Sequence, residues 1–139
     1  MSGIKGKNTM PERIVRSGLH RLGFRFRLHA RDIPGKPDLV LPKYRAVIFV
    51  NGCFWHGHDC HLFSWPSTRN KFWSEKILRN QARDAAASLA LTALGWRKAT
   101  IWECAVKGRE RVPAEQVAER IARWLGSNSS KFELRGKAH

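Results

Sequence analysis

The N-terminal part of the chain has apolar residues at the spacing of an amphipathic helix. These positions are Ile14, Val15, Leu19 and Leu22. Thr9 is a suitable N-cap, Pro11 suits the first helical position, and Gly23 is a suitable end. The pattern therefore predicts a helix that begins near Pro11 and ends before Gly23.

Three short segments that follow have the patterns of β-strands. In residues 24–29 apolar and polar side chains alternate strictly, which places both Phe residues and Leu28 on one face and predicts a half-buried strand. Residues 38–41 form a second, mostly apolar run. Residues 46–50 are apolar throughout, as expected for a strand that is buried on both faces.

The rest of the chain predicts two more helices and one more strand. Residues 51–70 read as a loop, and an alanine-rich helix follows over about 71–94, before a glycine. Residues 96–103 predict a strand, and a final helix runs from Pro113 to Gly126. The Ser-, Lys- and Gly-rich residues 127–139 are expected to fray as a flexible tail.

This order of elements predicts one α/β domain over residues 1–126. A helix that crosses between two strands favours a parallel pair, and the short connections before it favour antiparallel pairs. The fold class expected is therefore a mixed central β-sheet flanked by helices.

The net charge of the chain indicates more about its binding partners than about its fold. The 139 residues include 26 Lys plus Arg against 11 Asp plus Glu, which gives a formal net charge of +15. Such an excess favours a polyanion, most often nucleic acid. No apolar run approaches the ~18 residues of a membrane span, and no secretory signal begins the chain, so we expect a cytoplasmic protein without a membrane partner.

Residues 51–61, N-G-C-F-W-H-G-H-D-C-H, combine two thiols, three imidazoles and a carboxylate. With Cys104, the thiols of Cys53 and Cys60 and one loop histidine would complete a tetrahedral Cys₃His zinc site. The candidate fourth ligands are His56, His58 and His61. The alternative is three buried thiols beside exposed histidines. A zinc site would leave two loop histidines, and an imidazole is suited to proton transfer.

Asp38 stands directly before an apolar strand, where aspartate is disfavoured. A carboxylate at a strand end in a basic cleft can hold Mg²⁺ against a phosphodiester. The alternative is that Asp38 only completes the preceding turn, where aspartate is common.

The aromatic residues near the loop fall among basic side chains. Phe54, Trp55, Trp65 and Trp73 lie close in sequence to four basic residues, and Trp73, Lys76 and Asn80 share a helix face. This combination suits stacking on bases or wedging between them. The alternative is a small satellite core around the metal. Two further tryptophans, Trp102 and Trp124, are expected to pack in the main core.

Four long motifs closely resemble the very-short-patch repair (Vsr) DNA mismatch endonucleases. They are I-P-G-K-P-D-L-V-L, V-I-F-V-N-G-C-F-W-H-G-H-D-C-H-L-F, T-R-N-K-F-W-S-E-K-I and G-W-R-K-A-T-I-W-E-C-A. The likeness extends from Gly3 to about Leu125. It implies a fold related to the type II restriction endonucleases, with a structural zinc. It also implies a Mg²⁺-dependent enzyme that nicks one strand beside a T·G mismatch left by deamination of 5-methylcytosine.

The resemblance also implies roles for individual residues. Asp38 and the backbone carbonyl of Val50 match the magnesium ligands, His56 matches the catalytic base, and Glu12 matches a supporting carboxylate. The zinc ligands matched are Cys53, His58, Cys60 and Cys104. The DNA-binding positions matched are Phe54, Trp55 and Trp73 as an aromatic wedge, with Lys76 and Asn80 reading the mismatched pair.

The chain departs from the family pattern in two places, and in a third it departs only from the wider superfamily of restriction nucleases. Asn51 stands where relatives usually carry a second catalytic-site histidine, and an amide is not a base at neutral pH, so it can only orient water or phosphate. A basic arm found in relatives is mostly absent before Gly3, which predicts either weaker binding to DNA or a misassigned start codon. Strand 46–50 lacks the acidic-x-Lys element of ordinary restriction nucleases, as this family does.

Two other functions remain open at this point. The main rival is a zinc-stabilised DNA-binding protein with weak or no catalysis that marks mismatches. The other is a general RNA- or single-stranded-DNA-binding module without mismatch preference. For the nuclease we expect a monomer, because nicking one strand needs one active centre, and general mismatch-repair and resynthesis proteins as further partners.

Overall fold

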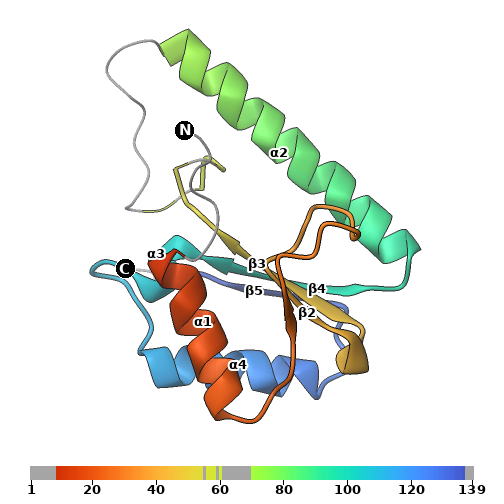
Figure 1. Cartoon of the computed structure of the whole chain (residues 1–139). Coiled ribbons are helices and arrows are strands. Elements are labelled where there is room, and N and C mark those ends of the chain that lie inside the picture. The colour runs from red at the N-terminus through yellow and green to blue at the C-terminus, as the bar shows by residue number, and fades with distance from the viewer. Residues whose placement is uncertain (1–8, 55, 59, 61–69, 137–139) are drawn as a thin grey trace.

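The computed structural model describes residues 9–54, 56–58, 60 and 70–136. Four helices and five strands are joined by a 3-10 turn and loops (Figure 1). In chain order they are α1 (Met10–Arg21), β1 (Arg27–Leu28), β2 (Leu39–Leu41), η2 (Pro42–Tyr44), β3 (Ala46–Asn51), α2 (Asn70–Ala93), β4 (Arg97–Trp102), α3 (Glu103–Val106), α4 (Ala114–Leu125) and β5 (Lys131–Leu134).

The five strands form one mixed sheet in the order β1-β2-β3-β4-β5. The first two pairings are antiparallel and the last two, β3 with β4 and β4 with β5, are parallel. Helix α2 makes the first parallel crossover and α4 contributes to the second. The predicted mixed sheet with a helical crossover is confirmed.

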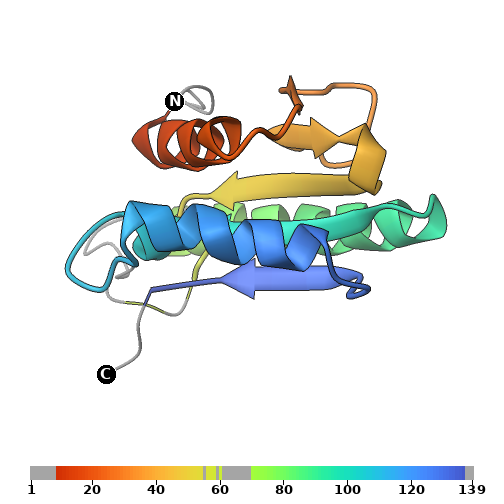
Figure 2. The ribbon, with the colours of Figure 1, turned by 90° about the horizontal axis from the view of Figure 1, so that it is seen from below.

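Helices cover both faces of this sheet. In Figures 1 and 2, α2 lies on one face, and α1 and α4 lie side by side on the other. Alternate residues of each central strand therefore enter different cores: Leu39 and Ile48 pack toward α1 and α4, whereas Val40 and Val47 pack beside Leu91 of α2. Coverage on both faces explains why the two central runs are almost entirely apolar.

Helix α1 begins as its sequence predicts. The side-chain oxygen of Thr9 accepts a hydrogen bond from the backbone N–H of Glu12 at 3.3 Å, which satisfies one of the unpaired donors of the first turn. A methyl group placed on Gly18 would lie 2.7 Å from the Cβ atom of Ala118. Glycine at this position therefore permits the close approach of α1 to α4.

The structure contradicts two predictions about which residues form strands. Only Arg27–Leu28 of the segment 24–29 pairs as a strand, since its partner β2 has just three residues, and Leu28 is 41 % exposed. The segment after Gly126 was expected to fray, yet it forms β5 beside β4 and buries Leu134 in the core. Alternating apolar side chains in a polar segment supply the inward face of this edge strand.

Trp124 is buried in the main core, as predicted. Trp102 is only partly buried and lies at the end of β4, so its expected core position is wrong. No helix within the described residues is long and apolar enough to cross a membrane.

Candidate active site and metal centre

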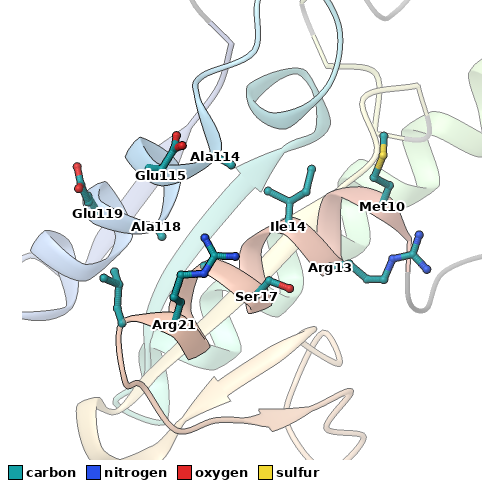
Figure 3. A pocket seen from close by; sticks show the side chains of 11 residues that line it. Met10, Arg13, Ile14, Ser17, Arg21, Ala114, Glu115, Ala118 and Glu119 are labelled. Atoms are coloured by element: carbon teal, nitrogen blue, oxygen red, sulfur yellow. The ribbon is translucent and has the colours of Figure 1, made fainter.

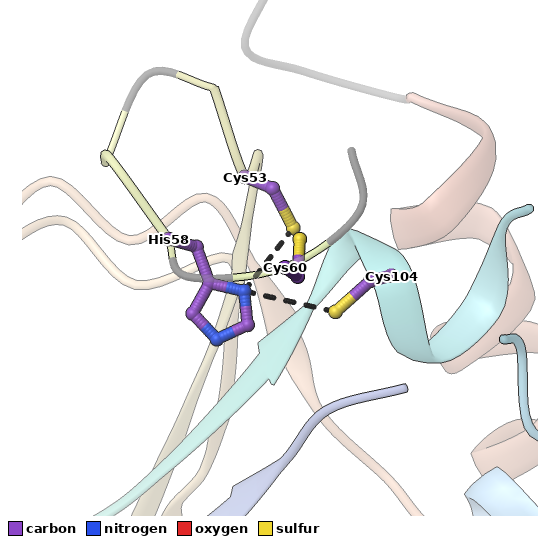
Figure 4. Close-up of side chains that lie close together, drawn as sticks. All are labelled: Cys53, His58, Cys60 and Cys104. Atoms are coloured by element: carbon purple, nitrogen blue, oxygen red, sulfur yellow. Dashed lines mark hydrogen bonds between the residues drawn. The ribbon is translucent and has the colours of Figure 1, made fainter. Parts of the chain in front are cut away.

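Three thiols and one imidazole meet at the end of β3 and the start of α3 (Figure 4). Cys53, His58 and Cys60 come from the loop after β3, and Cys104 comes from α3. Their four ligand atoms all lie within 4.8 Å of one another. Nδ1 of His58 is 3.5 Å from the sulfur of Cys53 and 3.7 Å from that of Cys104. The cluster is compatible with a bound metal ion, and it contains the histidine that the resemblance indicates.

Because the cluster is buried, the deprotonated form of its thiols is unfavourable unless a cation is bound. Desolvation raises the pKa of the thiols of Cys53 and Cys104. A metal ion reverses this penalty, because it stabilises deprotonated sulfur directly. Three sulfurs and one nitrogen are a donor set that zinc takes in closed, tetrahedral sites, so the residues present fit that ion.

Two groups brace the cluster from the sheet side. The indole of Trp102 stacks on the His58 ring, with centroids 3.9 Å apart and planes 5° from parallel. The backbone N–H of Gly136, just after β5, lies 3.3 Å from the sulfur of Cys104. The partly buried position of Trp102 thus has a local reason, since its ring covers a histidine of the cluster.

Asp38 lies immediately before β2, next to the end of β3. Its Oδ2 accepts a hydrogen bond from the backbone N–H of Val50 at 2.7 Å. Burial raises the pKa of this carboxyl from 3.8 to about 7, although the Val50 hydrogen bond opposes the shift. The nearby Glu12 raises the pKa further, while the rings of His29 and His56 lower it. The carboxylate is therefore desolvated, and cationic groups near it would stabilise its charged form.

A second cluster of ligand atoms surrounds Asp38. Glu12, His29 and Asp38 place one ligand atom each within 4.8 Å of the others. Glu12 is 1 % exposed, and its Oε2 is 2.6 Å from Nε2 of His29. Arg16 lies 3.5 Å from the same oxygen. Helix α1 and the start of β2 thus bring two carboxylates and one imidazole to one point.

His56 lies in the loop between Cys53 and His58 and forms a short contact with helix α2. Its Nδ1 is 2.5 Å from Oδ2 of Asp84. Nε2 of Gln81, one turn earlier, donates to the backbone carbonyl of His56 at 2.9 Å. Because one ring nitrogen is engaged by Asp84, the other is the one available for proton transfer. His56 is close enough to Asp38 to lower the pKa of that carboxyl.

The other predicted site residues divide between β3, the loop and α2. Asn51 is the last residue of β3 and is opposite Trp102 in the register. The rings of Phe54 and Trp73 meet edge to face, with centroids 5.5 Å apart. Lys76 and Asn80, both partly buried, follow Trp73 along α2. Trp55, His61 and Trp65 lie outside the described residues.

Sequence reasoning missed two residues of this site. His29 stands at the end of a predicted strand and Asp84 stands within a long polar helix, 28 positions after its partner His56. Neither belongs to a local cluster of chemical groups along the chain. The pairing of β1 with β2 and the packing of α1 bring His29 to Asp38 and Glu12. The packing of α2 on the other face of the sheet brings Asp84 to His56 (Figure 1).

A separate groove lies between α1 and α4 (Figure 3). Its charged side chains are Arg13 and Arg21 on one helix and Glu115 and Glu119 on the other. It contains none of the site residues predicted from the sequence. A smaller hollow is lined by His56, His58, Asp84 and Trp102.

Known proteins are similar in sequence to most of this chain. The family model described as DNA mismatch endonuclease Vsr matches residues 1–62. The DNA mismatch endonuclease Vsr of Escherichia coli is 44 % identical over 134 residues, which are 96 % of this chain and 86 % of that protein. A type II nicking enzyme of Xanthomonas oryzae pv. oryzae is 53 % identical over 104 residues, 75 % of this chain and 76 % of the relative.

A further type II nicking enzyme, from Neisseria meningitidis, is 41 % identical over 109 residues, 78 % of each chain. The mixed sheet flanked by helices agrees with the restriction-endonuclease-like fold that the resemblance implies. The extent of the match to the Escherichia coli protein is well beyond a shared motif. The chain therefore belongs to the Vsr family of DNA mismatch endonucleases, which makes it a DNA endonuclease that hydrolyses phosphodiester bonds.

Proposed function

We propose that this endonuclease nicks one strand of duplex DNA beside a T·G mismatch that arises from deaminated 5-methylcytosine, in a Mg²⁺-dependent reaction. The observation that carries the proposal is the convergence of Asp38 and His56. A desolvated carboxylate and an imidazole from a different segment lie close enough to interact electrostatically. An acidic metal ligand and a base on opposite sides of one phosphodiester would need this arrangement.

In this proposal Asp38 and the backbone carbonyl of Val50 hold Mg²⁺, with Glu12 as a supporting carboxylate. The donor set fits, because Mg²⁺ is bound through one or two carboxylates together with water and substrate phosphate oxygens. When bound, the ion would stabilise charge on the phosphate and on the leaving oxygen. The raised pKa of Asp38 supports this assignment, since the site disfavours the carboxylate charge without a cation.

His56 takes the proton of the attacking water in this reaction. Its contact with Asp84 fixes the ring orientation and leaves the second nitrogen to face the substrate. The loop that carries His56 is held at both sides by ligands of the Cys₃His cluster. We assign Zn²⁺ to that cluster, with Cys53, His58, Cys60 and Cys104 as ligands. The metal would thus be structural, and it would position the base. Asn51, which ends β3, is assigned to orient water or phosphate.

Mismatch recognition is assigned to aromatic side chains of residues 54 and 55, after β3, and to aromatic and polar side chains in the first half of α2. Phe54, Trp55 and Trp73 would wedge beside the mismatch, and the contact between Phe54 and Trp73 supports a shared surface. A T·G wobble weakens stacking, so insertion there requires less energy than at a matched pair. Lys76 and Asn80 would read the mismatched bases.

The remaining partners follow from the substrate. Because the substrate is chromosomal DNA, we expect the enzyme in the cytoplasm with the nucleoid. General mismatch-repair and resynthesis proteins would act on the nick. Since each nick needs one set of Asp38 and His56, a monomer would suffice.

A nicking assay on defined duplexes tests the proposal. Otherwise identical duplexes would carry T·G, C·G or T·A at one position, with each strand labelled separately. We expect Mg²⁺-dependent cleavage of one strand in the T·G duplex and little cleavage of the matched duplexes. Tight T·G binding without any nick would support the rival mismatch-binding protein, and equal binding of single-stranded and mismatched DNA would support a general binding module. Either result would contradict the proposal.

A further inference from the structure

His29 has an unusual backbone conformation next to Asp38. Its φ is +51°, in the left-handed region that few residues other than glycine adopt. Its backbone N–H donates to the carbonyl oxygen of Asp38 at 2.9 Å. This hydrogen bond continues the pairing of β1 with β2 by one position. The backbone of His29 is therefore tied directly to the residue proposed to hold the cation.

The side chain of His29 reaches the opposite wall of the same site. Its Nε2 is 2.6 Å from Oε2 of Glu12, which is 1 % exposed. Two carboxylates, those of Glu12 and Asp38, converge here and repel each other when both are charged; burial raises the pKa of Asp38 most, and the nearby Glu12 raises it further. A hydrogen-bond donor between strand and helix offsets this repulsion and fixes one carboxylate against the other.

Most non-glycine residues in the left-handed region are strained, and such residues occur at sites where surrounding contacts impose the conformation. Here the surrounding contacts are two: the backbone N–H of His29 donates to the carbonyl of Asp38, and the ring of His29 contacts the carboxylate of Glu12. A side chain present only for packing would need no such bridge, and His29 is not among the core residues of either cluster.

We propose that His29 is a positioning residue for the divalent cation site, which holds the Glu12 carboxylate beside Asp38 through its Nε2–H. The inference rests on the proposed function, in that it takes Asp38 as the cation ligand. It assigns His29 no contact with the substrate. Its consequence is that loss of the Nε2–H weakens cation binding, while the mismatch-binding surface on α2 stays as it is.

Two substitutions separate this role from a merely structural one. His29→Gln places an amide N–H near the position of Nε2 and should keep the bond to Glu12. His29→Asn is too short to reach Glu12, but asparagine tolerates a positive φ, so the backbone should be retained. His29→Asn thus removes the contact without adding backbone strain. His20→Ala, at an exposed position in the last turn of α1, is the matched control.

The primary measurement is Mn²⁺ binding to the DNA-free protein, followed by the electron paramagnetic resonance signal of free Mn²⁺. We expect His29→Asn to raise the Kd for Mn²⁺ by roughly 10-fold, and His29→Gln and His20→Ala to leave it nearly unchanged. The Mg²⁺ concentration for half-maximal nicking should rise by a similar factor in His29→Asn alone. The affinity for a T·G duplex without divalent ions, and the melting temperature, should match those of the parent protein.

Three outcomes would overturn the inference. Normal Mn²⁺ affinity in His29→Asn would show that the contact does not position the cation site. An equal loss of Mn²⁺ affinity in His29→Gln and His29→Asn would show that a hydrogen-bond donor to Glu12 is not what maintains the cation site. A fall in melting temperature that accounts for the loss would show a structural role. Asp38→Ala, measured in parallel, separates this result from the proposed function, because nicking by Asp38→Ala would contradict the proposed function and not the role of His29 alone.

Discussion

The backbone N–H of Val50 lies 2.7 Å from Oδ2 of Asp38 and donates a hydrogen bond to it. The backbone at the end of β3 thus orients the carboxylate that immediately precedes β2. In the proposed reaction, the carbonyl of Val50 and the carboxylate of Asp38 hold one ion. The antiparallel register of β2 and β3 therefore determines the geometry of the cation site.

Ionisation of Asp38 should destabilise the fold when no divalent ion is present. Its pKa is raised by burial to about 7 from 3.8, so the protonated form favours the folded state. This contribution is complete below about pH 4 and is lost as the pH rises through 7. Asp38→Asn should therefore be more stable than the parent at pH 8, by on the order of 1–3 kcal/mol, and equally stable near pH 4.

Urea unfolding at several pH values, without added divalent ions, measures this difference. The control is Asp32→Asn, at an exposed position where the carboxylate pairs with Arg27. Asp32→Asn should lack the gain in stability over the parent that is expected of Asp38→Asn at pH 8. A stability difference between Asp38→Asn and the parent that is the same at pH 4 and pH 8 would contradict the expectation.

Asp84 should affect the rate of nicking through its contact with His56. Asp84→Ala removes the group that contacts Nδ1 of His56, so the ring can turn and take the wrong tautomer. We expect the single-turnover nicking rate to fall by roughly 10- to 100-fold, and His56→Ala to lower it by roughly 10²- to 10⁴-fold. In the double variant the losses should not multiply, because both act on one base. Multiplicative losses would place Asp84 in an independent role.

The Cys₃His cluster should contain one zinc ion per chain by elemental analysis. Cys104→Ser should lose zinc, because it removes the ligand that ties the loop to α3. Removal of the metal with a chelator should lower the melting temperature by at least about 10 °C, and zinc-saturated chelator should have no effect. A metal-free protein of unchanged stability would contradict the structural role.

The family resemblance implies that Asn51 occupies a position where relatives usually carry a second histidine. Asn51→His adds an imidazole at the end of β3, beside Asp38 and Val50 in the proposed site. We expect faster nicking, or a changed pH profile, with unchanged affinity for the T·G duplex. An identical rate and pH profile for Asn51→His and the parent would show that this position takes no part in the reaction.

The sequence was sufficient where chemistry is concentrated locally. Cys53, Cys60 and three histidines fall within nine residues, so the loop indicated a metal site, and the family resemblance singled out His58. The structure brings Cys104 to Cys53, His58 and Cys60. The apolar run of residues 46–50 likewise predicted a strand that is buried on both faces. These predictions depend on spacing along the chain, which the sequence shows directly.

What the sequence did not show depends on tertiary packing. His29 becomes part of the site through the pairing of β1 with β2 and the packing of α1, and Asp84 through the packing of α2 on the other face of the sheet. The strand β5 was missed because its composition is polar and only its pairing with β4 identifies it. Alternation over 24–29 suggested a longer strand than β1, because strand length is limited by the three residues of β2.

The requirement for Asp38 in cleavage is the central claim, and single-turnover nicking of a T·G duplex by Asp38→Ala tests it most directly. Asp32→Ala serves as the control, and the binding of each variant to the same duplex is measured without Mg²⁺. We predict that Asp38→Ala binds the duplex like the parent protein but leaves both strands intact at every Mg²⁺ concentration. A Mg²⁺-dependent nick made by Asp38→Ala at the parental rate would contradict the account.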